Sequence, residues 1–139
     1  MGFALLFGSV LVAVGLVHVC LSSLPDQCLD GQPQPYSEKF NCTGSLNASV
    51  STIVRGAFLE HNRLKSIYLR KNKITLIEEG AFEGLGNSLL ALDLSTNDIQ
   101  LIRRNTFRGL HKLLWLTLSN NRITEMEDHA FNGLELLVL

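Results

Sequence analysis

Apolar residues recur at fixed spacings and organise about half of the chain into repeating units. Three consecutive segments, 64–88, 89–112 and 113–136, align residue for residue, with one extra residue in the first. Each segment carries an apolar residue in the same seven columns. These are Leu64, Ile67, Leu69, Ile74, Ile77, Phe82 and Leu85, then Leu89, Leu92, Leu94, Ile99, Ile102, Phe107 and Leu110, then Leu113, Leu116, Leu118, Ile123, Met126, Phe131 and Leu134. Seven columns that agree three times indicate an internal repeat.

The first part of each unit predicts a short β-strand. Apolar and polar residues alternate around Ile67, Leu92 and Leu116, which is the period of a strand with one buried face. The later part loses this alternation, so we expect an irregular or short helical return. One unit cannot offset the cost of ordering its residues, about 1.5 kcal/mol each. Stacked units cover both sides of each apolar layer and pair their strands in parallel, so the pattern predicts an α/β solenoid.

One asparagine stands at the same place in every unit, as Asn72, Asn97 and Asn121. Each lies three residues after the second strand leucine, inside an otherwise apolar frame. Burying an amide without partners is costly, so these side chains must form hydrogen bonds. We expect a structural asparagine ladder that bonds the turn backbone of its own coil and of the adjacent coil.

These motifs resemble the leucine-rich-repeat family. The pattern LxxIxLxxNxI begins at Leu64, and LxxLxLxxNxI begins at Leu89 and again at Leu113. The later part of each unit is similar to the typical 24-residue subclass, which is frequent in secreted and cell-surface members. The resemblance implies a parallel sheet on a concave face and macromolecular recognition, as in Toll-like, Slit-like and matrix-proteoglycan proteins. Upstream, residues 50–63 match the return half of a partial first repeat.

Strand residues between the buried positions should face the concave side. The candidate ligand contacts are Ser66, Tyr68, Arg70, Asp93, Ser95, Trp115, Thr117 and Ser119. Trp115, the one tryptophan of the chain, is out of phase with the apolar columns. Tyr, Trp and Arg often dominate binding energy. Two structural alternatives stay open: Trp115 packs over Ala91, or Arg70 pairs with Asp93 across adjacent strands.

The N-terminal residues 1–22 have the pattern of a secretory signal. The chain is almost wholly apolar from Phe3 to Leu21, and Cys20 and Ser22 satisfy the small-residue demand of a cleavage site after Ser22. A basic segment before the apolar run is missing, so an uncleaved signal anchor is the alternative. Both predict the secretory pathway and a secreted, extracellular or cell-surface protein.

Residues 23–49 are expected to form an N-terminal cap. They contain Cys28 and Cys42, and a disulfide between them would close a loop of about fifteen residues, worth roughly 3 kcal/mol; two free thiols are the alternative. The resemblance supports a cap here, although family caps usually carry four cysteines. Two glycosylation sequons begin at Asn41 and Asn47. Asn47 is favoured, because the cysteine inside the first sequon should hinder modification.

Charge and motifs favour binding over catalysis. Twelve Lys and Arg stand against thirteen Asp and Glu, without a basic run for nucleic acid. No common catalytic motif occurs, so we expect no enzyme, no cofactor and no metal site. The expected partner is a protein ligand or a cell-surface or matrix macromolecule, and no nucleic acid. A structural matrix or adhesion protein of the same fold is the alternative.

Residues 137–139 resemble the start of a truncated fourth repeat. We therefore expect the chain to be a fragment; a natural chain that covers this open edge with a partner is the alternative. Membrane contact is expected only through an uncleaved N-terminal anchor or a missing C-terminal segment.

Overall fold

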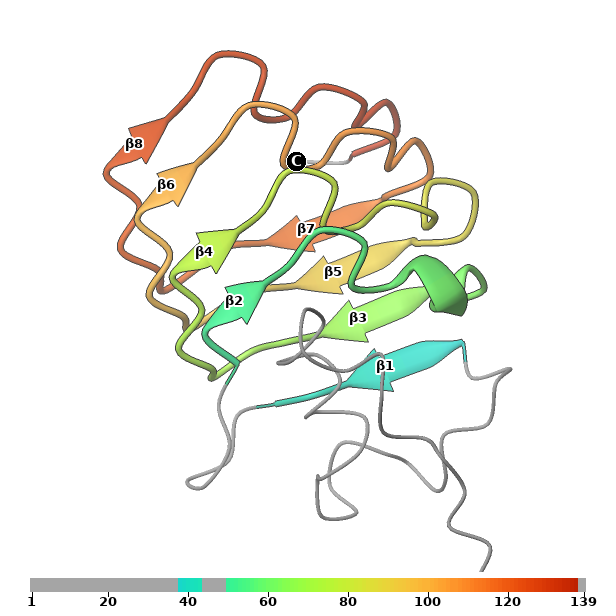
Figure 1. Ribbon diagram of the computed structural model, residues 1–139, viewed down its shortest axis with the longest axis horizontal. Helices are drawn as coiled ribbons and strands as arrows, with labels where there is room; N and C mark the ends of the chain where they lie inside the picture. Colours follow the sequence, from blue (N-terminus) through green and yellow to red (C-terminus); the bar gives the residue numbers. More distant parts are fainter. Residues whose placement is uncertain (1–37, 44–49, 138–139) are drawn as a thin grey trace, which may run out of the picture.

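The computed structural model of the chain describes residues 38–43 and 50–137 (Figure 1). The signal, Cys28 and Asn47 lie outside the described residues. The predictions of signal cleavage, of the Cys28–Cys42 disulfide and of a glycan on Asn47 therefore stay predictions.

Four short parallel strands form the main sheet. They are β1 (Lys39–Asn41), β3 (Ser66–Tyr68), β5 (Ala91–Asp93) and β7 (Trp115–Thr117), in the spatial order β1-β3-β5-β7. Ile67 is in register with Leu92, and Leu92 with Leu116. Equivalent residues of successive repeats therefore lie side by side, one coil above the next (Figure 1). This arrangement confirms the predicted solenoid with a parallel sheet.

The returns carry a second row of two-residue strands. β2 (Thr52–Ile53) pairs with β4 (Leu76–Ile77), and β6 (Leu101–Ile102) pairs with β8 (Glu125–Met126). In the described part of the chain, the helical structure is one 3-10 turn, η1 (Leu59–His61). The remaining returns are turns, as the loss of alternation in the sequence predicts.

The apolar columns fill the interior of the coil. Ile67 and Leu92 have no exposed surface. Phe58, Phe82, Phe107 and Phe131 form one stack along the return side, with ring centroids separated successively by 6.0, 6.1 and 5.6 Å. Each ring thus covers the apolar face of the ring in the preceding coil.

Within the described residues, the last coil has a neighbouring coil on one side only. Leu116 is only partly buried, and Phe131 and Met126 are 40% and 60% exposed. Their counterparts one coil earlier, Phe107 and Ile102, are buried. Burial in this fold therefore depends on having a neighbouring coil on both sides.

The asparagine ladder forms as predicted. Asn97 Oδ1 accepts a hydrogen bond from the backbone amide of Ile74 at 3.1 Å, and its Nδ2 donates to the carbonyl oxygens of Leu69 and Leu94, both at 3.0 Å. Asn72 and Asn121 repeat the arrangement. Each side chain therefore connects its own turn to the preceding coil.

The residue before each ladder asparagine has a left-handed backbone. Lys71, Thr96 and Asn120 have φ values of 57°, 55° and 55°. Each of these residues lies three positions after the end of its main strand. The backbone amide still donates to the next coil, from Lys71 to Ser95 O and from Thr96 to Ser119 O. Thr96 is strained there, because a β-branched residue rarely adopts positive φ.

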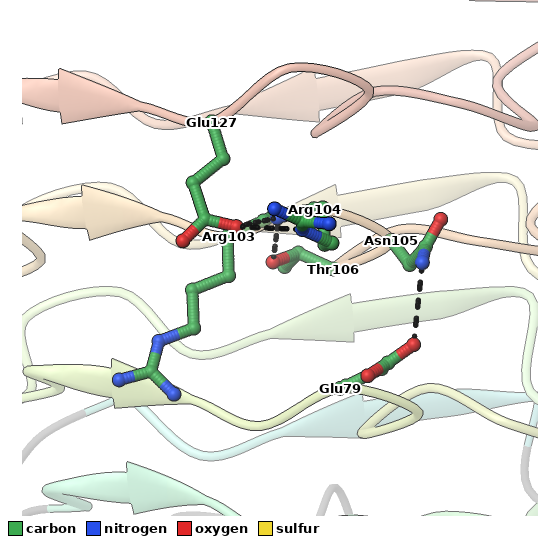
Figure 2. A network of polar contacts seen from close by, with 6 residues as sticks. All are labelled: Glu79, Arg103, Arg104, Asn105, Thr106 and Glu127. Atoms are coloured by element: carbon green, nitrogen blue, oxygen red, sulfur yellow. Dashed lines mark hydrogen bonds and ion pairs between the residues drawn. The ribbon is translucent and has the colours of Figure 1, made fainter.

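A polar network joins the coils on the return side (Figure 2). Glu127 Oε2 accepts hydrogen bonds from the backbone amide of Arg104 at 2.9 Å and from its Nε at 3.3 Å. The backbone hydrogen bond is the main reason that the pKa of Glu127 lies below its ordinary value, and the charges of Arg104 and Arg103 add to it. Asn105 Nδ2 donates to Glu79 Oε1 at 3.2 Å. These contacts fix the spacing of the returns.

Candidate functional site

The outward side of the main sheet presents a continuous row of side chains from successive coils. We call this the sheet surface and define it by the outward residues of the four strands and the polar residues that follow them. They are Lys39, Asn41, Ser66, Tyr68, Arg70, Ala91, Asp93, Ser95, Trp115, Thr117 and Ser119. The structure thus brings together all eight residues that the sequence nominated as ligand contacts, because the strands are in register.

Tyr68 and Arg70 occupy the coil nearest β1. Tyr68 is partly exposed and Arg70 is exposed, while Ile67 and Leu69 between and beside them are fully buried. Within the described residues, Arg70 forms no ion pair with Asp93. The guanidinium of Arg70 is therefore not held by that neighbour, and the cross-strand ion pair left open by the sequence does not form.

Asp93 contributes to the turn rather than to the exposed surface. Its side chain is oriented so that Oδ1 accepts the backbone amide of Ser95 at 2.9 Å, and the residue is 7% exposed. Thr117 has the same place one coil later, where its Oγ1 lies 3.1 Å from Ser119 Oγ and 3.4 Å from Ser119 N. Short polar side chains commonly bond nearby backbone in this way. Asp93 consequently offers a ligand less surface than Tyr68 does.

Trp115 begins an exposed apolar cluster that the sequence analysis did not nominate in full. Trp115, Leu114 and Leu90 are 45%, 44% and 36% exposed. The backbone amides of Leu114 and Trp115 both donate to the carbonyl oxygen of Leu90, at 2.9 and 3.0 Å. We call these three residues the apolar corner. Leu90 and Leu114 each directly follow a buried column leucine, and that double-leucine pattern was the signal that could have revealed them.

Trp115 is in register with Ala91 on the neighbouring strand. Alanine provides little area for an indole to cover, and 45% of Trp115 stays exposed. Burial against Ala91 is therefore partial. The remaining surface of Trp115 is open to a ligand.

β1 extends the sheet surface by two residues that sequence reasoning missed. It lies inside the expected cap, yet it pairs with β3, with Lys39 opposite Ser66 and Asn41 opposite Tyr68. An ion pair of 2.7 Å joins Glu38 and Lys65, the residues that directly precede these two strands. The signal in the sequence was weak, because only Phe40 and Cys42 alternate as buried residues there.

The described residues lack two other kinds of site. Residues 38–43 and 50–137 contain no group of three or more His, Cys, Asp or Glu placed to hold a metal ion. In the same part of the chain, no helix has the length and apolar character needed to cross a membrane.

The fold and this surface define a class, the repeat solenoids that present the outward residues of a parallel sheet. The family profile described as leucine rich repeat matches residues 46–99 and 87–139, more than half of the sequence. The chain belongs to the leucine-rich-repeat family.

Relatives of the chain include other leucine-rich-repeat proteins and Toll-like receptors. Leucine-rich repeats and immunoglobulin-like domains protein 3 of Homo sapiens is 39% identical over 75 residues, which are 54% of this chain and 7% of that protein. Toll-like receptor 3 of Boselaphus tragocamelus is 33% identical over 102 residues, which are 71% of this chain and 11% of the receptor. The chain thus spans a small part of the length of these relatives.

A solved structure has the same architecture. The crystal structure of a TLR13–ssRNA13 complex superposes with a TM-score of 0.61 and 37% sequence identity, over 65% of this chain and 12% of that one. In that structure the receptor is in complex with a single-stranded RNA. The expectation that nucleic acid is excluded as a partner of this chain therefore has no support.

Proposed function

We propose that the chain is an extracellular recognition module that binds a protein ligand through the sheet surface. The observation that supports this proposal is the separation of buried and exposed residues along each strand. Inward residues such as Ile67 and Leu92 are fully buried, whereas Tyr68, Arg70 and Trp115 keep exposed surface. The fold therefore needs the first set for packing, and the second set remains available for a partner.

The composition of the sheet surface favours a macromolecular ligand. Neighbouring strands lie about 4.8 Å apart, so Tyr68, Asp93 and Thr117 follow one another along the sheet at that spacing. Such a row suits an extended contact better than a small molecule, which usually needs a concave pocket. Trp115 and Tyr68 supply large areas with polar ends, as in residues that dominate binding energy.

The apolar corner is the expected centre of the contact. Trp115, Leu114 and Leu90 are three exposed large apolar residues, and the backbone amides of Leu114 and Trp115 both donate to Leu90 O. Exposed apolar clusters with a polar rim commonly mark interaction sites. Hydroxyl groups of Thr117 and Ser119 lie on the same coil and provide the rim.

Sequence features typical of exported proteins support the same function. The apolar segment before Ser22 and the two sequons fit the secretory pathway. The extracellular-type relatives agree with this route. We propose secretion or surface display accordingly, with binding rather than catalysis as the activity.

Binding measurements with matched variants test the proposal. The secreted protein is screened by biolayer interferometry against purified ectodomains and matrix proteins, with a single-stranded RNA oligonucleotide as a separate probe. For a bound protein, Trp115→Ala combined with Tyr68→Ala should weaken affinity at least tenfold, about 1.4 kcal/mol. Lys112→Ala, an exposed change on the return side, should leave affinity unchanged.

Two results would overturn this assignment. One is protein binding that survives the double change but is lost in Lys112→Ala. The other is tight binding of the RNA probe without any protein ligand, which would assign the sheet surface to nucleic acid.

A further inference from the structure

The first sequon of the chain lies on the sheet surface. Asn41 is the last residue of β1 and is in register with Tyr68 on β3. It is partly exposed, and its two chain neighbours, Phe40 and Cys42, are buried at 5% and 1%. The side chain of Asn41 therefore shares the outward side of the sheet with Tyr68, at a distance of one strand spacing, about 4.8 Å.

The local hydrogen bonding of Asn41 leaves its nitrogen available. Thr43 Oγ1 donates to Asn41 Oδ1 at 2.9 Å. Asn41 Nδ2, the atom that an N-linked sugar modifies, donates no hydrogen bond within the described residues. A sugar on Nδ2 would consequently break none of the side-chain hydrogen bonds that the structure describes at this position.

The middle residue of the sequon does not oppose a sugar in the folded protein. Cys42 is directed into the core beside Phe40, so its side chain and a substituent on Asn41 would lie on opposite sides of the strand. The sequence argument against this sequon concerned hindrance by the cysteine. The strand geometry removes the steric part of that argument.

We propose that Asn41 carries an N-linked glycan that covers the β1–β3 end of the sheet surface. The β5–β7 end then remains the part that a ligand can reach. This inference rests on the proposed function, because it needs export and a ligand on the same surface. In the transfer step, Asn41 Nδ2 forms a bond to the anomeric carbon of a lipid-diphosphate-linked oligosaccharide. The bond from that carbon to the diphosphate oxygen breaks, and the lipid diphosphate leaves while Nδ2 loses one proton.

The glycan divides the sheet surface into two parts. Tyr68 lies next to Asn41, while Trp115 lies three strand spacings from β1, about 14 Å away. A sugar is bulky and hydrophilic, so it shields its immediate neighbours most. The ligand then contacts chiefly the apolar corner, with Tyr68 at the boundary.

Glycan occupancy is the first measurement. The full chain is secreted from cultured mammalian cells, and an Asn47→Gln variant isolates the first sequon. Treatment with a peptide N-glycosidase should shift its gel mobility, and mass spectrometry should place the modification on Asn41. Thr43→Ser preserves the sequon and should keep the glycan, whereas Thr43→Ala should remove it.

Surface labelling is the second measurement. Hydroxyl-radical footprinting of the Asn47→Gln protein, before and after enzymatic removal of the glycan, should show Tyr68 labelled at least twofold more strongly after removal. Met126, which is 60% exposed on the last coil, should change little. This comparison requires no knowledge of the ligand.

The outcomes separate this inference from the proposed function. A bare Asn41 in secreted protein, or a glycan without protection of Tyr68, overturns the inference and leaves sheet-surface binding intact. A chain that is not exported overturns both. Loss of ligand binding in the Trp115→Ala and Tyr68→Ala variant, without glycan on Asn41, supports the proposed function alone.

Discussion

The side-chain oxygen of Asn97 accepts the backbone amide of Ile74 from the preceding coil at 3.1 Å. The same side chain donates to Leu69 O in that coil and to Leu94 O in its own turn. One buried amide thus satisfies three backbone groups that water cannot reach. Neighbouring coils are joined by side-chain hydrogen bonds as well as by sheet pairing.

Replacing Asn97 with alanine should destabilise the protein by about 3 kcal/mol, because a buried amide and buried carbonyls lose their partner. Chemical denaturation followed by circular dichroism measures the loss. Asn132→Ala, at an exposed position whose side chain forms no hydrogen bond within the described residues, is the matched control and should change stability by less than about 0.5 kcal/mol. Equal losses in the two variants would contradict the ladder.

Thr96→Asn should stabilise the protein by about 0.5–1 kcal/mol. Thr96 has φ of 55°, where a β-branched residue is strained and asparagine is tolerated. Asn120 already occupies the equivalent position with the same φ. Thermal unfolding checks the gain. Thr52→Asn, in the extended strand β2, should have the opposite sign, because asparagine is disfavoured in strands.

Phe82→Ala should cost about 3–5 kcal/mol, because it opens a cavity between two stacked rings. Phe131→Ala removes the same atoms from a ring that is 40% exposed and stacked on one side in the described residues. Its cost should be less than about half as large. Denaturant titration of both variants compares them directly, and similar costs would refute the dependence of burial on flanking coils.

Acidification should weaken the contact of Glu127 with Arg104. The pKa of Glu127 is lowered in the folded protein, chiefly by the hydrogen bond from the Arg104 amide. The contribution is therefore fully present above the ordinary glutamate pKa and is lost as the pH falls through the lowered value. The wild type should lose more stability than Glu127→Gln over that range, as denaturation at a series of pH values can measure.

Salt provides the control for this pH effect. High ionic strength screens the charges of Arg103 and Arg104 but leaves the backbone hydrogen bond in place. Most of the difference in stability between wild type and Glu127→Gln should therefore persist in 1 M salt. The screening length there is about three times shorter than in 0.1 M salt. Its complete loss would assign the lowered pKa to charge alone.

The repeat made the core and the ladder predictable from sequence. Ile67, Leu92 and Asn97 recur in register, so each column supports the others, and the structure places all three as expected. β1 lacked that support. Its three residues contain only one buried strand position, Phe40, with Cys42 beyond the end, and such a short alternation cannot be distinguished from a loop.

The sheet surface was predictable in position but less so in exposure. Alternation placed Tyr68, Asp93 and Thr117 on the outward side, which is where the strands put them. The burial of Asp93 depends on the local hydrogen bond that its Oδ1 accepts from the Ser95 amide. Hydrophobic periodicity does not predict such a bond. The exposure of Leu90 and Leu114 depends likewise on the backbone path between return and strand.

The alternation of buried and outward positions in β3, β5 and β7 has a consequence for how new specificities arise. Outward residues such as Ser66 and Trp115 keep exposed surface, so we expect the scaffold to stay folded when they are exchanged. Inward residues tolerate little change. Each coil can therefore acquire a new outward surface while the inward residues that hold the fold stay the same.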